Sequence, residues 1–119
     1  MYDTCHGQML GVIGARQQGE KEVVTDQLEL INKFSGRINH IHIIDSDNTC
    51  HNDADGNDET SAHPPFGDGI LDFDIIVPVL AKDNIGHDWL TVDLCFWPVA
   101  WDATEKCKSA LDNLVSKYG

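Results

Sequence analysis

Basic residues are scarce in this sequence. Its 119 residues include 8 Lys and Arg but 20 Asp and Glu, which gives a formal net charge of −12. Proteins bind nucleic acids largely by neutralising phosphates with Lys and Arg, so this balance argues against a nucleic-acid partner. Several of the acids lie in one stretch, DSDNTCHNDADGNDET at residues 45–60. An acidic cluster of this kind attracts metal cations.

Paired cysteine motifs and long apolar runs are also missing. Cys5, Cys50, Cys95 and Cys107 stand far apart, so they form neither a C-x-x-C motif nor a compact disulfide framework. This pattern indicates reduced thiols in a cytoplasmic protein. The stretch MYDTCHGQML lacks the basic start and apolar core of a signal peptide. No apolar run approaches the ~18 residues that span a bilayer, so we expect no membrane partner.

Helical and strand patterns alternate along the chain. Apolar spacing predicts a helix from Val24 to Phe34, ended by Gly36, and a second helix that begins at Asp72 and runs towards Gly86. A third helix covers 101–119, and Asp102 and Glu105 have the spacing of a capping box there. RINHIHII and DWLTVDLCF predict strands, and residues 46–69 predict a long acidic loop. Such alternation favours an α/β fold with parallel strands joined by helical crossovers.

Each predicted strand has one apolar side and one side that turns polar towards its end. Successive side chains of a strand face opposite sides, so Ile41 and Ile43 share one side while His40 and His42 share the other. In the second strand, Asp93 lies on the side opposite Leu90, Val92 and Leu94, together with Thr91 and Cys95. A (β/α) barrel accommodates this pattern, because its packed interior opens into a reaction site at the carboxyl ends of the strands.

Four motifs occur in a recognisable order: DTCH at 3–6, HIHIIDS at 40–46, HPPFGDG at 63–69 and the strand-end Asp93. The ordered set resembles the sugar phosphate isomerase/epimerase superfamily, the xylose isomerase-like TIM barrels. The resemblance covers nearly the whole chain but only the last part of the family's barrel. It implies a partial (β/α) TIM barrel of about the last three β/α units, from the end of strand 6 to helix 8. A complete barrel takes ~250 residues, so we expect this chain to need the missing N-terminal half or self-association.

The resemblance also implies a metal site. By position, Asp3, His42 and Asp93 correspond to the metal ligands of the sixth, seventh and eighth strands. Asp93 stands where the family has a Glu that binds metal and moves a proton, and its side chain is one methylene shorter. The family's fifth-strand Glu, which completes the metal site, has no counterpart here.

Three further residues correspond to substrate-binding positions. His6 would contact substrate or a further metal and take a catalytic part beside Asp93. Asp45 and His63 would contact the substrate. Outside the resemblance, His40 is expected to be a buried, hydrogen-bonded histidine, His51 to be exposed in the acidic loop, and His87 to lie on the surface.

Carboxylate and imidazole ligands suit a divalent ion such as Mn²⁺, Mg²⁺, Co²⁺ or Zn²⁺. With such an ion, the resemblance implies a metal-dependent isomerase or epimerase that acts on a small sugar, or its phosphate, through an enediolate.

Two alternatives stay open. The first is a metal-dependent phosphodiesterase of the endonuclease IV type, which DTCH, HIIDS and the glycines after His63 favour. The acidic charge and the replacement of that branch's D-x-H by Ser61-Ala62-His63 argue against it. The second is a non-catalytic fragment that binds metal weakly.

Overall fold

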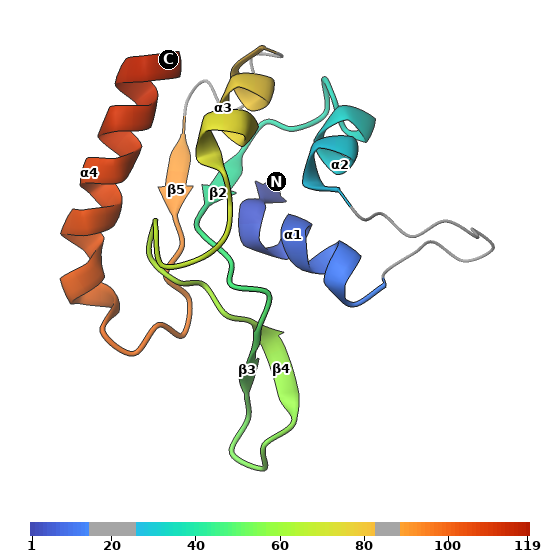
Figure 1. Ribbon diagram of the computed structural model, residues 1–119, viewed down its shortest axis with the longest axis vertical. Helices are drawn as coiled ribbons and strands as arrows, with labels where there is room; N and C mark the ends of the chain where they lie inside the picture. Colours follow the sequence, from blue (N-terminus) through green and yellow to red (C-terminus); the bar gives the residue numbers. More distant parts are fainter. Residues whose placement is uncertain (15–25, 83–88) are drawn as a thin grey trace.

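In the computed structural model the chain folds as a mixed α/β structure, described over residues 1–14, 26–82 and 89–119 (Figure 1). Its three-stranded sheet has the order β1-β2-β5 and its strands are parallel. The strands are β1 (Tyr2–Asp3), β2 (Ile41–Ile43) and β5 (Leu90–Val92). The helices are α1 (Thr4–Val12), α2 (Gln27–Lys33), α3 (Phe73–Lys82) and α4 (Ala100–Tyr118). The predicted alternation of helix and strand and the parallel pairing are confirmed.

The register of the sheet aligns the ends of its strands. Asp3 pairs with His42, and His42 pairs with Thr91. Because all three strands run in the same direction, their carboxyl ends meet at one edge of the sheet. Side chains at or just after these ends are therefore held close together by backbone pairing.

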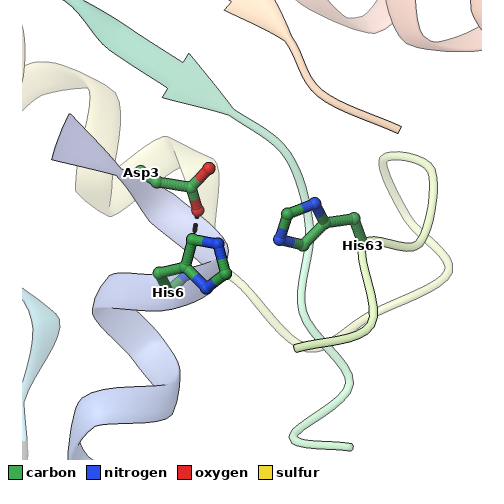
Figure 2. A group of neighbouring side chains, drawn as sticks. All are labelled: Asp3, His6 and His63. Carbon is green, nitrogen blue, oxygen red and sulfur yellow. Dashed lines mark hydrogen bonds between the residues drawn. The ribbon is translucent and has the colours of Figure 1, made fainter. Parts of the chain in front are cut away.

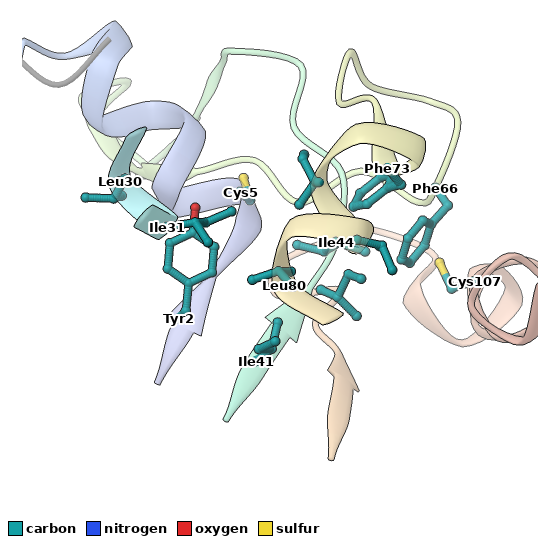
Figure 3. Packing of buried hydrophobic residues seen from close by; sticks show 13 residues of the cluster. Tyr2, Cys5, Leu30, Ile31, Ile41, Ile44, Phe66, Phe73, Leu80 and Cys107 are labelled. Carbon is teal, nitrogen blue, oxygen red and sulfur yellow. The ribbon is translucent and has the colours of Figure 1, made fainter. Parts of the chain in front are cut away.

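The core lies between the sheet and the helices. Ile41, Ile43 and Ile44 are almost completely buried. Figure 3 shows α3 lying over the strands, with Leu80 of the helix close to the strand residues. The apolar sides predicted for the strands thus face the helices, as the alternation required.

The predicted helices are present in the described part of the chain, with different ends. Asp26 caps α2 by accepting a hydrogen bond from the Leu28 amide, and Gly36 follows this helix with a φ of +73°. The predicted start near Val24 and the predicted end of the second helix at Gly86 lie outside the described residues. Asp72 caps α3 as predicted, since its carboxylate accepts from the Asp74 amide.

The capping box predicted for the last helix is wrong. The helix begins at Ala100, before Asp102, and Val99 occupies the N-cap without a side-chain hydrogen bond. Asp102 therefore lies within the first turn instead of at the cap. Cys107 of this helix is buried, and Leu111 and Leu114 pack against the core.

The acidic stretch is more ordered than the predicted loop. It contains an antiparallel hairpin of β3 (Cys50–Asn52) and β4 (Asp58–Ser61), which extends from the body of the molecule in Figure 1. Asp53 holds the turn, because its Oδ1 accepts from the amides of Asp55 and Asn57, and Gly56 adopts a φ of +86°.

A buried hydroxyl joins α1 to the end of β2. Thr4 Oγ1 donates to the Ile44 carbonyl at 2.6 Å and accepts from the Ile44 amide at 2.9 Å. This pair of bonds sets the start of α1 beside the strand end. Throughout the described ranges, no helix combines the length and apolar character needed to cross a bilayer.

Candidate metal centre

Three predicted ligands meet at the carboxyl edge of the sheet. Asp3 ends β1, His42 lies in β2 and Asp93 follows β5. His42 Nδ1 lies 2.9 Å from Asp93 Oδ2 and 3.7 Å from Asp3 Oδ2. One ligand atom from each residue lies within 4.8 Å of the other two, so these residues form a group that could hold a metal ion.

Asp3 uses its two carboxylate oxygens differently. Oδ1 caps α1 by accepting from the His6 amide at 2.8 Å. Oδ2 is buried, faces the ring of His42 and has no hydrogen-bond partner among the described residues. A buried oxygen without a partner costs about 1–3 kcal/mol. The second oxygen is therefore placed where a cation would satisfy it.

His63 supplies a second unsatisfied group. Its side chain is 2% exposed, and neither ring nitrogen has a hydrogen-bond partner in the described structure. Nδ1 lies 3.8 Å from Asp93 Oδ1. Burial lowers the pKa of His63 below its usual value, although the carboxylates of Asp3 and Asp93 act in the opposite direction. A neutral imidazole with free nitrogens is the form that binds metals.

His6 joins Asp3 and His63 in a second group that could hold an ion. One ligand atom of each lies within 4.8 Å of the others, and the rings of His6 and His63 are 4.9 Å apart in an edge-to-face arrangement. Figure 2 shows the three side chains gathered where the start of α1 faces the segment after β4. Ser61 orients the exposed His6 ring through a 3.1 Å hydrogen bond to Nδ1.

Cys95 forms a third group with His63 and Asp93, again with ligand atoms within 4.8 Å of one another. Desolvation raises the pKa of the Cys95 thiol above its ordinary value, and the carboxylate of Asp93 adds to this effect. Cys95 was not among the site residues predicted from the sequence. The strand alternation contained the information, since it placed Cys95 on the same side as Asp93.

Asp45 has a structural role in place of the predicted substrate contact. It is 1% exposed and both of its oxygens accept backbone hydrogen bonds. Oδ2 accepts from Gly67 and Gly69, while Oδ1 accepts from Ser46 and Leu71. The carboxylate therefore fixes the loop after His63 and has no free oxygen directed at the metal groups.

The remaining histidines differ in their surroundings. His40 is half-buried, and its Nε2 lies 3.3 Å from the Thr91 hydroxyl, in agreement with a hydrogen-bonded histidine. His51 is not free in solvent as predicted, because it is half-buried in β3 and stacks on Phe96 at a ring distance of 5.0 Å. His87 lies outside the described residues.

The donor set fits a divalent cation. Asp3 Oδ2 and both nitrogens of His63 are buried groups without partners, and they lie beside Asp93 and His42. His42 Nδ1 and Asp93 Oδ2 lie 2.9 Å apart, within hydrogen-bond distance, beside these groups. Imidazole and carboxylate ligands favour Mn²⁺, Co²⁺ or Zn²⁺ over the alkali metals. A comparison with known protein families, curated proteins and solved structures found no match to this chain.

Proposed function

We propose that this chain provides the metal-binding part of a sugar isomerase or epimerase that transfers a proton through an enediolate. The observation that carries the proposal is the convergence of Asp3, His42 and Asp93 at the carboxyl edge of a parallel sheet. The ordered motifs that resemble the sugar phosphate isomerase/epimerase superfamily support the same function.

The sheet is proposed to correspond to the last three strands of a (β/α) barrel. Its strands are parallel, and their order β1-β2-β5 follows the chain once the hairpin is set aside. The polar cluster lies at the carboxyl ends, where TIM-barrel enzymes place their active sites. The helices pack against the apolar side of the strands, as the outer ring of a barrel does.

Asp3, His42 and Asp93 would hold the ion. A bound divalent cation supplies Lewis-acid stabilisation to the developing enediolate oxygens of a ketose. His42 Nδ1 and Asp93 Oδ2 lie 2.9 Å apart, so both residues would present ligand atoms to the same ion.

Two residues are proposed to handle the substrate proton. Asp93 is 25% exposed at its side chain, so a substrate could reach the carboxylate. His6 is exposed, and its bond to Ser61 engages Nδ1, which leaves Nε2 for the substrate. A carboxylate and an imidazole on different elements meet the requirement for one group to remove a proton and another to return it.

Proton exchange at carbon tests this proposal. The purified chain is incubated in D₂O with Mn²⁺ and a panel of ketohexoses and their phosphates, and deuterium uptake beside the carbonyl is followed by NMR. We expect metal-dependent uptake, because enediolate formation exchanges this hydrogen even when isomerisation is slow. Asp93→Asn should abolish uptake and Asp112→Asn, a change on the exposed face of α4, should preserve it. Both residues proposed to move the proton lie in this chain, so absence of uptake while Mn²⁺ is bound would contradict their proposed roles.

A phosphodiesterase of the endonuclease IV type is the second candidate. The group of Asp3, His6 and His63 favours it, since a second ion beside the first would form the paired-metal arrangement used in phosphate-ester cleavage. The net charge of −12 opposes binding of a nucleic-acid backbone. Metal-dependent hydrolysis of bis(4-nitrophenyl) phosphate, without deuterium uptake into ketoses, would select this candidate.

A further inference from the structure

The group of His63, Asp93 and Cys95 differs from the other two because it contains a thiol. Its ligand atoms lie within 4.8 Å of one another, and it shares Asp93 with the group formed by Asp3 and His42. Thiolates favour softer ions such as Zn²⁺, whereas sites rich in oxygen suit Mg²⁺ and Mn²⁺. The two groups therefore differ in the ions they select.

The burial of His63 is independent evidence that an ion binds between His63, Asp93 and Cys95. Its side chain is 98% buried and directs unpartnered nitrogens into the cluster, with Nδ1 3.8 Å from Asp93 Oδ1. A histidine in the core normally satisfies at least one nitrogen with a protein or water partner. An ion bound between His63, Asp93 and Cys95 would satisfy this requirement.

The backbone after β5 brings the thiol to the carboxylate. The Cys95 amide donates to Asp93 Oδ1 at 3.0 Å, which turns the chain immediately after the strand. The Trp97 amide then donates to the Leu94 carbonyl at 3.0 Å, and Phe96 in this turn has a φ of +59°. This left-handed conformation is costly for a bulky residue. The chain thus holds Cys95 beside Asp93 instead of continuing straight from the strand.

We propose that His63, Asp93 and Cys95 form a thiolate-containing site for a borderline-soft divalent ion of the Zn²⁺ class. The proposal rests on the proposed function in one respect, which is that Asp93 serves as a ligand to both ions. Binding converts the Cys95 thiol to a thiolate, and its proton passes to solvent as the metal–sulfur bond forms. One thiolate and one carboxylate together balance the charge of the ion, while neutral His63 contributes a nitrogen ligand.

Cobalt absorption tests the assignment without any measurement of activity. The reduced full chain is titrated with Co²⁺, whose thiolate complexes give a charge-transfer band in the near ultraviolet. We expect this band in the unaltered chain, loss of the band in Cys95→Ser, and retention in the matched control Cys50→Ser. Cys50 is also a free cysteine, but it lies on the hairpin and belongs to none of the three groups.

Alkylation provides a second measurement on the unaltered chain. Cys95 is exposed, so iodoacetamide should modify it in the metal-free protein. Saturating Zn²⁺ should slow modification at Cys95 at least tenfold and leave modification at Cys50 unchanged, as located by peptide mass spectrometry.

The outcomes separate this inference from the proposed function. Co²⁺ binding with visible ligand-field bands but no thiolate band, together with unprotected Cys95, would overturn the thiolate site and leave the Asp3–His42–Asp93 site intact. Absence of Co²⁺ binding would overturn both. A thiolate band that survives Cys95→Ser but disappears in Cys50→Ser would also overturn the assignment.

Discussion

Replacement of Asp3 by Asn should increase the stability of the metal-free protein while it removes stabilisation by metal. The substitution preserves the N-cap oxygen that accepts from the His6 amide, and Asn is as good an N-cap residue as Asp. It removes the negative charge from the buried Oδ2, which has no hydrogen-bond partner and lies in a group with the Asp93 carboxylate. The variant therefore removes the charge and keeps the cap, while it replaces the buried oxygen by an amide nitrogen.

The magnitude follows from the geometry. The ligand oxygens of Asp3 and Asp93 lie within 4.8 Å of each other, and two unit charges at that limit repel by roughly 3.5 kcal/mol at an effective dielectric constant of about 20. Solvent at the 25% exposed Asp93 side chain reduces this repulsion, and the nearby His42 ring offsets another part. We expect the metal-free Asp3→Asn variant to gain about 1–2 kcal/mol in the free energy of unfolding.

Metal should reverse the order of stability. At a free concentration of about 100 times Kd, a ligand that binds only the folded state adds about 2.7 kcal/mol. The unaltered chain should show this gain, whereas Asp3→Asn should show little of it. Urea unfolding followed by far-ultraviolet circular dichroism, with EDTA and with Mn²⁺, measures both quantities. Asp112→Asn is the matched control and should not change the response to metal.

Two results would refute this reasoning. The first is a metal-free Asp3→Asn variant that is less stable than the unaltered chain, because the charge would then contribute favourably to the fold. The second is equal stabilisation of both proteins by Mn²⁺, because the ion would then bind elsewhere, for example on the acidic hairpin.

Four further substitutions test other parts of the structure. Burial lowers the pKa of His63, so the unfolded chain binds a proton at this residue more readily than the folded chain does. The free energy of unfolding should therefore fall as pH drops below about 6.5. Urea titrations with EDTA measure this pH dependence, which His63→Gln should flatten. An unchanged slope would contradict that account. Gly69→Ala should cost about 1–3 kcal/mol in urea unfolding, because the new Cβ would overlap the Asp45 carboxylate and the Ser46 carbonyl. Gly67→Ala has open space around its Cβ and should cost only about 1 kcal/mol, for its φ of +85°. Equal costs would contradict the steric argument. Thr4→Val should cost about 2–4 kcal/mol by the same assay, since both backbone groups of Ile44 would lose their partner, and a loss below about 1 kcal/mol would contradict the role of the hydroxyl.

The resemblance to the isomerase/epimerase superfamily implied Asp3, His42 and Asp93 as ligands, and two simple rules explain why these residues lie together. Alternation along a strand places His42 and Asp93 on the side away from the core. Parallel pairing then brings the strand ends together, and the register of Asp3 with His42 completes the group. Neither rule requires knowledge of loops.

The hairpin and the role of Asp45 were not predicted, for different reasons. The hairpin at residues 50–61 consists largely of Asp, Asn, Thr and Ser, and Asp and Asn in particular are rare in strands. The turn of the hairpin could have been predicted from Asp53 and Gly56, because Asp and Gly are common in tight turns. The role of Asp45 depends on four backbone amides that converge only in the folded chain, so no spacing in the sequence reveals it.

Electron spin echo spectroscopy of bound Mn²⁺ tests the central claim most directly, because it detects imidazole nitrogen in the first coordination sphere. Our account predicts a nitrogen modulation in the unaltered chain that disappears in His42→Gln. The modulation should persist in His40→Gln, since that ring lies beside His42 but belongs to none of the metal groups. Bound Mn²⁺ without nitrogen modulation, or modulation that survives His42→Gln, would contradict a cation held between Asp3, His42 and Asp93.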